Sequence, residues 1–177
     1  YLRVRSPEGV ARAVAAAANS RLYSTGVATP RASVAAPRAG AGRSSEAPAV
    51  LIETRTLDRG GLERVVADMA LALRERGFRV AIAVTERDGR IGAECRAAGL
   101  TVYAPVPGPD AFGQCLEIEQ PDLVICHYST VGAPVAAERG IPVIDILHNA
   151  YIWASPAEHR AISANAAHVS KYVAVSE

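Results

Sequence analysis

The fold is decided by residues 49–84, which read AVLIETRTLDRGGLERVVADMALALRERGFRVAIAV. An almost purely apolar run, Ala49–Glu53, comes first, and a second apolar run, Phe78–Val84, closes the stretch. Apolar runs without alternation are typical of parallel strands that are covered on both faces of a sheet. Between them, a turn with two adjacent glycines, Gly60 and Gly61, opens a segment with helical spacing. The stretch therefore predicts a strand, a helix and a parallel strand.

The helical segment extends from Gly61 to Gly77, a residue that commonly ends helices. Its apolar side chains recur on one helical face: Leu62, Val65, Val66, Met69 and Leu73. Glu63 lies in the first turn, where the helix dipole favours an acid, and we interpret it as a solvated carboxylate.

The rest of the chain repeats this alternation of apolar runs and helical segments. Six strands are predicted: Ala49–Glu53, Phe78–Val84, Leu100–Ala104, Asp122–Cys126, Ile141–Leu147 and Tyr172–Val175. Weaker helices are predicted over 90–98, 110–119, 130–138 and 156–167. The pattern predicts an α/β fold with a doubly wound, parallel, Rossmann-like sheet, strand order 3-2-1-4-5-6 and right-handed crossovers.

The first 48 residues differ from this domain. Residues 1–50 contain seven arginines against two glutamates. We interpret residues 1–23 as an isolated helix that could end a preceding module, since Ser6-Pro7-Glu8 resembles a helix start. Residues 24–48 consist of small residues, proline, arginine and one glutamate, which predicts an irregular linker. The domain proper is predicted over 49–177, and we expect it to be incomplete at its carboxyl end.

Composition excludes several classes of protein. Nineteen basic and eighteen acidic residues leave a net charge of +1, which argues against a nucleic-acid binder. No run approaches the roughly 18 apolar residues that span a membrane. Three widely spaced cysteines support neither a disulfide framework nor a zinc site. A reducing, cytoplasmic location without a bound metal is the simplest interpretation.

The candidate site lies at the carboxyl ends of the strands, where ligands bind in such sheets. The Gly60-Gly61 turn can bring backbone N–H groups and a helix amino terminus to a phosphate, although a tight turn alone would also use glycine. His148 and Asn149 follow the fifth predicted strand, and His127 follows the fourth. A histidine at either position could contact a sugar hydroxyl or a leaving group, or could simply order its loop.

Familiar motifs are missing from the sequence: GxGxxG, GxxxxGK[ST], GxSxG and HExxH. A nucleotide-cofactor oxidoreductase is one alternative. Glu86 lies where a ribose-binding acid would lie and favours it, whereas the missing GxGxxG argues against it. A non-catalytic binding module of Rossmann type is a second alternative, because fold does not determine function.

Four blocks together resemble glycosyltransferase family 4. They are Gly60–Val66 with its helix, Pro121–His127 followed by a helix and Gly140–Val143, Leu147–Tyr151, and the closing Tyr172–Glu177. The resemblance covers about residues 49–177, and its strength lies in the order and spacing of the blocks.

The resemblance implies the amino-terminal half of a GT-B fold, in which two Rossmann-like domains face each other across a cleft. It implies a retaining, hexosyltransferase-like enzyme of carbohydrate biosynthesis that uses a nucleotide-sugar donor, without a metal or other cofactor. The acceptor would be a glycan, a lipid or a small molecule. The matching residues imply donor diphosphate binding at Gly60 and Gly61 and a catalytic role for His148.

The resemblance also implies acceptor or sugar contacts at His127, Asn149 and Tyr151. The nucleotide would be held by a carboxyl-terminal domain in cis. We therefore expect residues 1–177 alone to be inactive.

Overall fold

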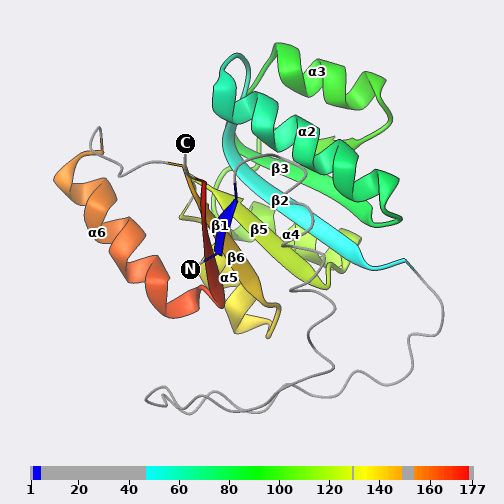
Figure 1. Ribbon diagram of the computed structural model, residues 1–177. Helices are drawn as coiled ribbons and strands as arrows, with labels where there is room; N and C mark the ends of the chain where they lie inside the picture. Colours follow the sequence, from blue (N-terminus) through cyan, green and yellow to red (C-terminus); the bar gives the residue numbers. More distant parts are fainter. Residues whose placement is uncertain (1, 5–46, 129, 149–153, 176–177) are drawn as a thin grey trace.

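A computed structural model describes residues 2–4, 47–128, 130–148 and 154–175 (Figure 1). These residues form one parallel sheet of seven strands, in the order β1-β7-β6-β5-β2-β3-β4. The strands are β1 (Leu2–Val4), β2 (Ala49–Leu57), β3 (Arg79–Asp88), β4 (Thr101–Tyr103), β5 (Leu123–His127), β6 (Val143–Leu147) and β7 (Lys171–Val175). The predicted order of the six strands from β2 onward is confirmed.

Helices connect the strands as expected for crossover connections. They are α2 (Gly61–Glu75), α3 (Arg90–Ala97), α4 (Pro109–Glu119), α5 (Gly132–Glu138) and α6 (Pro156–Asn165), with a short 3-10 helix η2 (Ala166–His168) after α6. The segments predicted as helices from residue 61 onward are thus all confirmed, with ends shifted by a few residues. No helix among the described residues is long and apolar enough to cross a membrane.

The sheet separates two apolar cores, with α2 and α3 on one face and α4 and α5 on the other (Figure 1). Alternate residues of β2 divide between them, since Val50 and Ile52 pack with α2 while Leu51 packs with α4 and α5. The same alternation explains why the strands are apolar throughout, because both of their faces are covered.

The amino-terminal residues give one correction. The sequence predicts an isolated helix over 1–23, but residues 2–4 form strand β1. This strand pairs in parallel with β7, from Leu2 opposite Val173 to Val4 opposite Val175. The open edge of β7 offers unpaired backbone groups, and a short extended segment satisfies them. The rest of the predicted helix and almost all of the predicted linker lie outside the described residues.

Strands β2 and β3 are longer than predicted and carry polar residues past the apolar core. β2 continues to Leu57, and its pairing with β3 shifts register between Thr54 and Thr56. A bulge of this kind bends a strand and re-aims its side chains, and bulges are common beside functional sites. The extension therefore carries the end of β2 toward the start of α2.

The sheet and the helix layer pack closely at Gly132, the first residue of α5. A Cβ atom on Gly132 would lie 2.5 Å from Oε2 of Glu53 and 2.6 Å from Cζ of Phe112, while a Cβ atom on Gly61, the first residue of α2, would meet nothing within 4 Å. We expect Gly132→Ala to lower the free energy of unfolding by about 2 kcal/mol, measured by urea denaturation. Gly61→Ala is the matched control and should stay within about 0.5 kcal/mol of the parent. Equal losses in both variants would contradict the close packing.

Candidate functional site

The carboxyl ends of β2, β5 and β6 lie side by side at the point where the strand order reverses. Thr54 of β2 pairs with His127 of β5, and Cys126 of β5 pairs with Asp145 of β6. The chain leaves β2 toward β3 on one side and returns to β5 on the other, which creates the switch point at which such sheets bind ligands. The candidate site predicted at the carboxyl ends of the strands thus has its described residues, Gly60, Gly61, His127 and His148, at this edge.

The Gly60-Gly61 turn joins the end of β2 to α2. Gly60 has a φ of 153°, whereas Gly61 has no positive φ and begins the helix. The conformational need for glycine therefore lies at Gly60 and not at Gly61. Gly61 instead faces open space, since an added Cβ would touch nothing within 4 Å. A ligand can thus approach the backbone at the amino terminus of α2.

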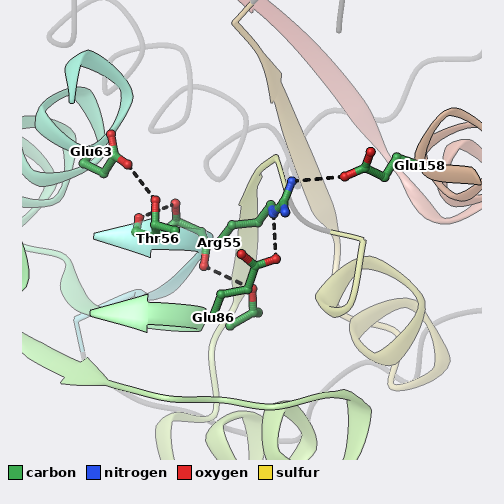
Figure 2. Close-up of polar contacts among 7 residues, drawn as sticks. Arg55, Thr56, Glu63, Glu86 and Glu158 are labelled. Carbon is green, nitrogen blue, oxygen red and sulfur yellow. Dashed lines mark hydrogen bonds and ion pairs between the residues drawn. The ribbon is translucent and has the colours of Figure 1, made fainter. Parts of the chain in front are cut away.

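Glu63 ties this turn to the sheet (Figure 2). Its Oε1 accepts a hydrogen bond of 2.6 Å from Oγ1 of Thr56, at the end of β2. The side chain is half-buried, so our interpretation of Glu63 as a solvated acid misses its structural contact. The bulge in β2, which has no signal in the sequence, brings Thr56 close enough to α2 to donate this hydrogen bond.

His127 and His148 form a direct pair. Nδ1 of His127 lies 2.7 Å from Nε2 of His148, and the ring centroids are 5.0 Å apart. His127 is fully buried and His148 half-buried. Burial, with the neighbouring His148, holds the pKa of His127 well below its ordinary value, and burial lowers the pKa of His148 to about 4. Both rings are therefore neutral at pH 7.

Tyr128 follows His127 in a backbone conformation that is uncommon outside glycine, with a φ of 53°. Its ring lies against His148, with centroids 5.4 Å apart and planes at 59°. Left-handed residues of this kind cost about 1 kcal/mol or more and cluster at functional sites. His148 thus contacts both His127, the last residue of β5, and Tyr128, which follows it.

A buried acid group occupies the other face of the same strand ends. Glu53 is fully buried, and its Oε1 accepts a 2.8 Å hydrogen bond from the backbone N–H of Gly132 at the start of α5. Burial and the nearby Glu53 raise the pKa of Asp145 to about 7. Burial, again with Glu53, raises the pKa of Cys126 well above its ordinary value. This group was not predicted, although one acid within each of two apolar runs, Glu53 in 49–53 and Asp145 in 141–147, is its signal in the sequence.

Arg55, near the carboxyl end of β2, connects this strand to β3 and to α6 (Figure 2). Its Nε lies 2.8 Å from Oε1 of Glu86 on β3, and one of its terminal nitrogens lies 3.4 Å from Oε1 of Glu158 on α6. Glu86, which favoured a ribose-binding role under the oxidoreductase alternative, is therefore paired with an arginine.

Comparison with protein families places this site in a known group. The model of Glycosyltransferase Family 4 matches residues 59–177. The chain belongs to glycosyltransferase family 4. The match begins at the Gly60-Gly61 turn and includes both histidines, and it identifies a glycosyltransferase domain with a Rossmann-like α/β fold. A search of curated proteins found no match.

The predicted site residues have different outcomes. Gly60, Gly61, His127 and His148 all lie at the same edge of the sheet. Asn149 and Tyr151 lie outside the described residues. Within the described residues, no three histidine, cysteine or acidic side chains gather into a possible metal site.

The raised pKa of Asp145 makes stability depend on pH. The folded carboxyl has a pKa of about 7 against 3.8 for the ordinary group, so the folded state holds more protons between these values. The contribution of the Asp145 carboxyl to the free energy of unfolding is therefore fully present below about pH 4, and it is lost as the pH rises through 7. Asp145→Asn should remove this loss, so the variant should gain about 3 kcal/mol relative to the parent between pH 4 and pH 8.

Urea denaturation of both proteins at each pH measures the difference. The histidines and Glu53 are present in both proteins, so subtracting one curve from the other removes most of their contribution. Parallel curves for the two proteins over this range would show that Asp145 ionises as readily in the folded as in the unfolded chain.

Proposed function

We propose that the chain is the acceptor-side domain of a retaining glycosyltransferase that transfers a sugar from a nucleotide-sugar donor. The observation that carries the proposal is the meeting of two features at one edge of the sheet. These are an accessible helix amino terminus at Gly60-Gly61 and a half-buried, neutral His148, within a domain of this family.

The diphosphate of the donor would lie at the start of α2. This helix is fifteen residues long, and its first backbone N–H groups have no partner within the helix. They carry the positive end of the helix dipole and favour an anion. Because Gly61 has no side chain and faces open space, the phosphate oxygens can come close to these groups.

His148 would contact the donor sugar or the oxygen that leaves with the diphosphate. A neutral imidazole gives one N–H donor and one acceptor nitrogen, which suits a sugar hydroxyl or a developing negative charge. Asn149 and Tyr151, which follow it in sequence, are proposed as further sugar or acceptor contacts.

The remaining parts of the proposal follow from the GT-B arrangement. A second Rossmann-like domain in cis would hold the nucleotide and supply basic residues to the diphosphate. We propose that the reaction needs no metal, since these groups would stabilise the leaving diphosphate, and that it takes place in the cytoplasm. The acceptor would be a glycan, a lipid or a small molecule.

The stereochemical outcome tests the reaction. We expect the protein that carries both domains to transfer sugar from one member of a nucleotide-sugar panel to an acceptor, with the anomeric configuration of the donor kept in the product. Proton NMR of the product at the first time points measures the configuration. A product of inverted configuration would contradict the retaining mechanism, and no consumption of any donor would contradict transfer from nucleotide sugars.

Two substitutions test the site. Gly61→Val should lower kcat at least a hundredfold, because the side chain would fill the space in front of the helix amino terminus. His148→Ala should lower kcat by a few hundredfold, the equivalent of about 3 kcal/mol for one lost donor. Gly61→Ala should fall between Gly61→Val and the parent.

Melting temperature is the control for folding. The open space around Gly61 and the partial exposure of His148 predict midpoints close to the parent for all three variants. Variants that melt early but turn over normally per folded molecule would make these residues part of the scaffold.

A further inference from the structure

The short contact between His127 and His148 limits how protons are arranged in the pair. A distance of 2.7 Å between two ring nitrogens is a hydrogen bond, and one proton lies in it. Since both rings are neutral at pH 7, each carries one N–H and one lone pair. Either His127 donates from Nδ1, or His148 donates from Nε2.

The other nitrogen of His127 decides between these two arrangements. Nε2 of His127 is buried and has no hydrogen-bond partner in the described part of the chain. If His148 donated, Nε2 of His127 would have to carry a proton that is buried without an acceptor. Buried N–H groups without a partner are rarer than buried acceptors without one. The favoured arrangement therefore leaves a lone pair on Nε2 and the proton on Nδ1.

The arrangement of His127 then fixes that of His148. Nε2 of His148 accepts the shared proton, so its own proton must lie on Nδ1. Nδ1 of His148 makes no hydrogen bond within the described residues, and the ring is only half-buried. The nitrogen that faces away from His127 is thus an N–H donor without an acceptor among the residues that the structure describes.

We propose that His127 is a positioning residue that holds His148 in the Nδ1–H tautomer and so directs an N–H donor at the donor sugar or its leaving oxygen. The proposal rests on the proposed function of His148 in sugar transfer. It gives His127 a role other than the sugar contact expected from the sequence, because a fully buried ring has no surface for a ligand.

Backbone geometry supports this role. His127 and His148 continue the alternation of Ile125 and Ile146, which pack on the α2 face of the sheet, so both rings lie on the side of the Gly60-Gly61 turn. Tyr128, with its left-handed φ, places its ring against His148 as well. His127 therefore fixes the tautomer of a ring whose rotation Tyr128 also limits.

The tautomer has a chemical consequence. An oxygen that gains negative charge as the diphosphate departs is stabilised by an N–H donor and repelled by a lone pair. A His148 that alternated between tautomers would present the wrong group for part of the time. No proton is transferred in this role, since His148 acts as a neutral donor.

Nitrogen NMR tests the tautomer directly, without substrate. In protein labelled with ¹⁵N-histidine, two-bond proton–nitrogen correlations identify which ring nitrogen carries the proton. We expect the proton on Nδ1 in both His127 and His148 at pH 7.5. In His127→Leu, His148 should show averaged signals from both tautomers. A proton on Nε2 of His148 in the parent protein would overturn the proposal.

Turnover of the protein that carries both domains tests whether the tautomer matters. His127→Leu should keep the fold, because it removes a buried polar ring and fills a similar volume, and should lower kcat about ten- to a hundredfold. His127→Asn places an amide N–H near the position of Nδ1 and should recover part of the loss. His127→Gln places its amide near Nε2 and should recover little. A folded His127→Leu variant with parental kcat would overturn the positioning role.

A matched control and a separate outcome complete the experiment. His159→Leu makes the same substitution on the exposed surface of α6 and should change neither the NMR signals of His148 nor kcat. If the NMR result is as expected but His148→Ala keeps normal turnover, the tautomer assignment stands and the proposed function of His148 fails.

Discussion

The central strand β2 is the constraint on which the site depends. It is hydrogen-bonded to β3 on one side and to β5 on the other, and its residues 49–54 are buried. Its register with β5 sets Glu53 beside Cys126 and Thr54 beside His127. A slip of one residue would turn every side chain to the opposite face, which the two apolar cores forbid. The positions of the acid group and of the histidine pair are therefore fixed by hydrophobic packing.

Burial shifts pKa values in opposite directions on the two faces of the sheet at these strand ends. On the α2 face it lowers the pKa values of His127 and His148, and on the α4 and α5 face it raises that of Asp145. Burial disfavours the charged form in each case. The histidines therefore bring no formal positive charge to a diphosphate at pH 7. Under the proposed function, the backbone N–H groups at the start of α2 would attract the diphosphate, and the absence of a side chain at Gly61 leaves room for it there.

Much of this arrangement could be predicted from the sequence because it depends on periodicity. Apolar runs and a helical stripe such as Leu62–Leu73 reveal elements and strand order, and the ends of strands reveal where to look for a site. Contacts made across the sheet leave no local signal. The pairing of His127 with His148 depends on two strands that are neighbours only after folding, and the sequence shows them 21 residues apart.

The ends of elements were the least predictable part, for related reasons. The extension of β2 past Glu53 depends on a bulge against β3. The polar residues there, such as Thr56, lack the apolar pattern from which a strand is predicted. β1 pairs through its backbone with a strand that lies about 170 residues further along the chain. Backbone pairing at a sheet edge requires few particular side chains. The residues Leu2–Val4 therefore carry no sequence pattern that distinguishes a strand from the start of a helix.

Helix α6 shows how little of the site depends on elements outside this edge. It has no buried residue, and its start is stabilised by a local capping box between Ser155 and Glu158. Its described ion pair to the sheet is the contact of Glu158 with Arg55, a partly exposed pair at 3.4 Å. Exposed pairs of this kind contribute at most about 1 kcal/mol. The helix is therefore held largely by its own sequence, whereas the histidines and the Gly60-Gly61 turn are fixed by strands and a helix that the cores bury. Loss of the Arg55 contact would affect the position of α6 more than that of the histidine pair.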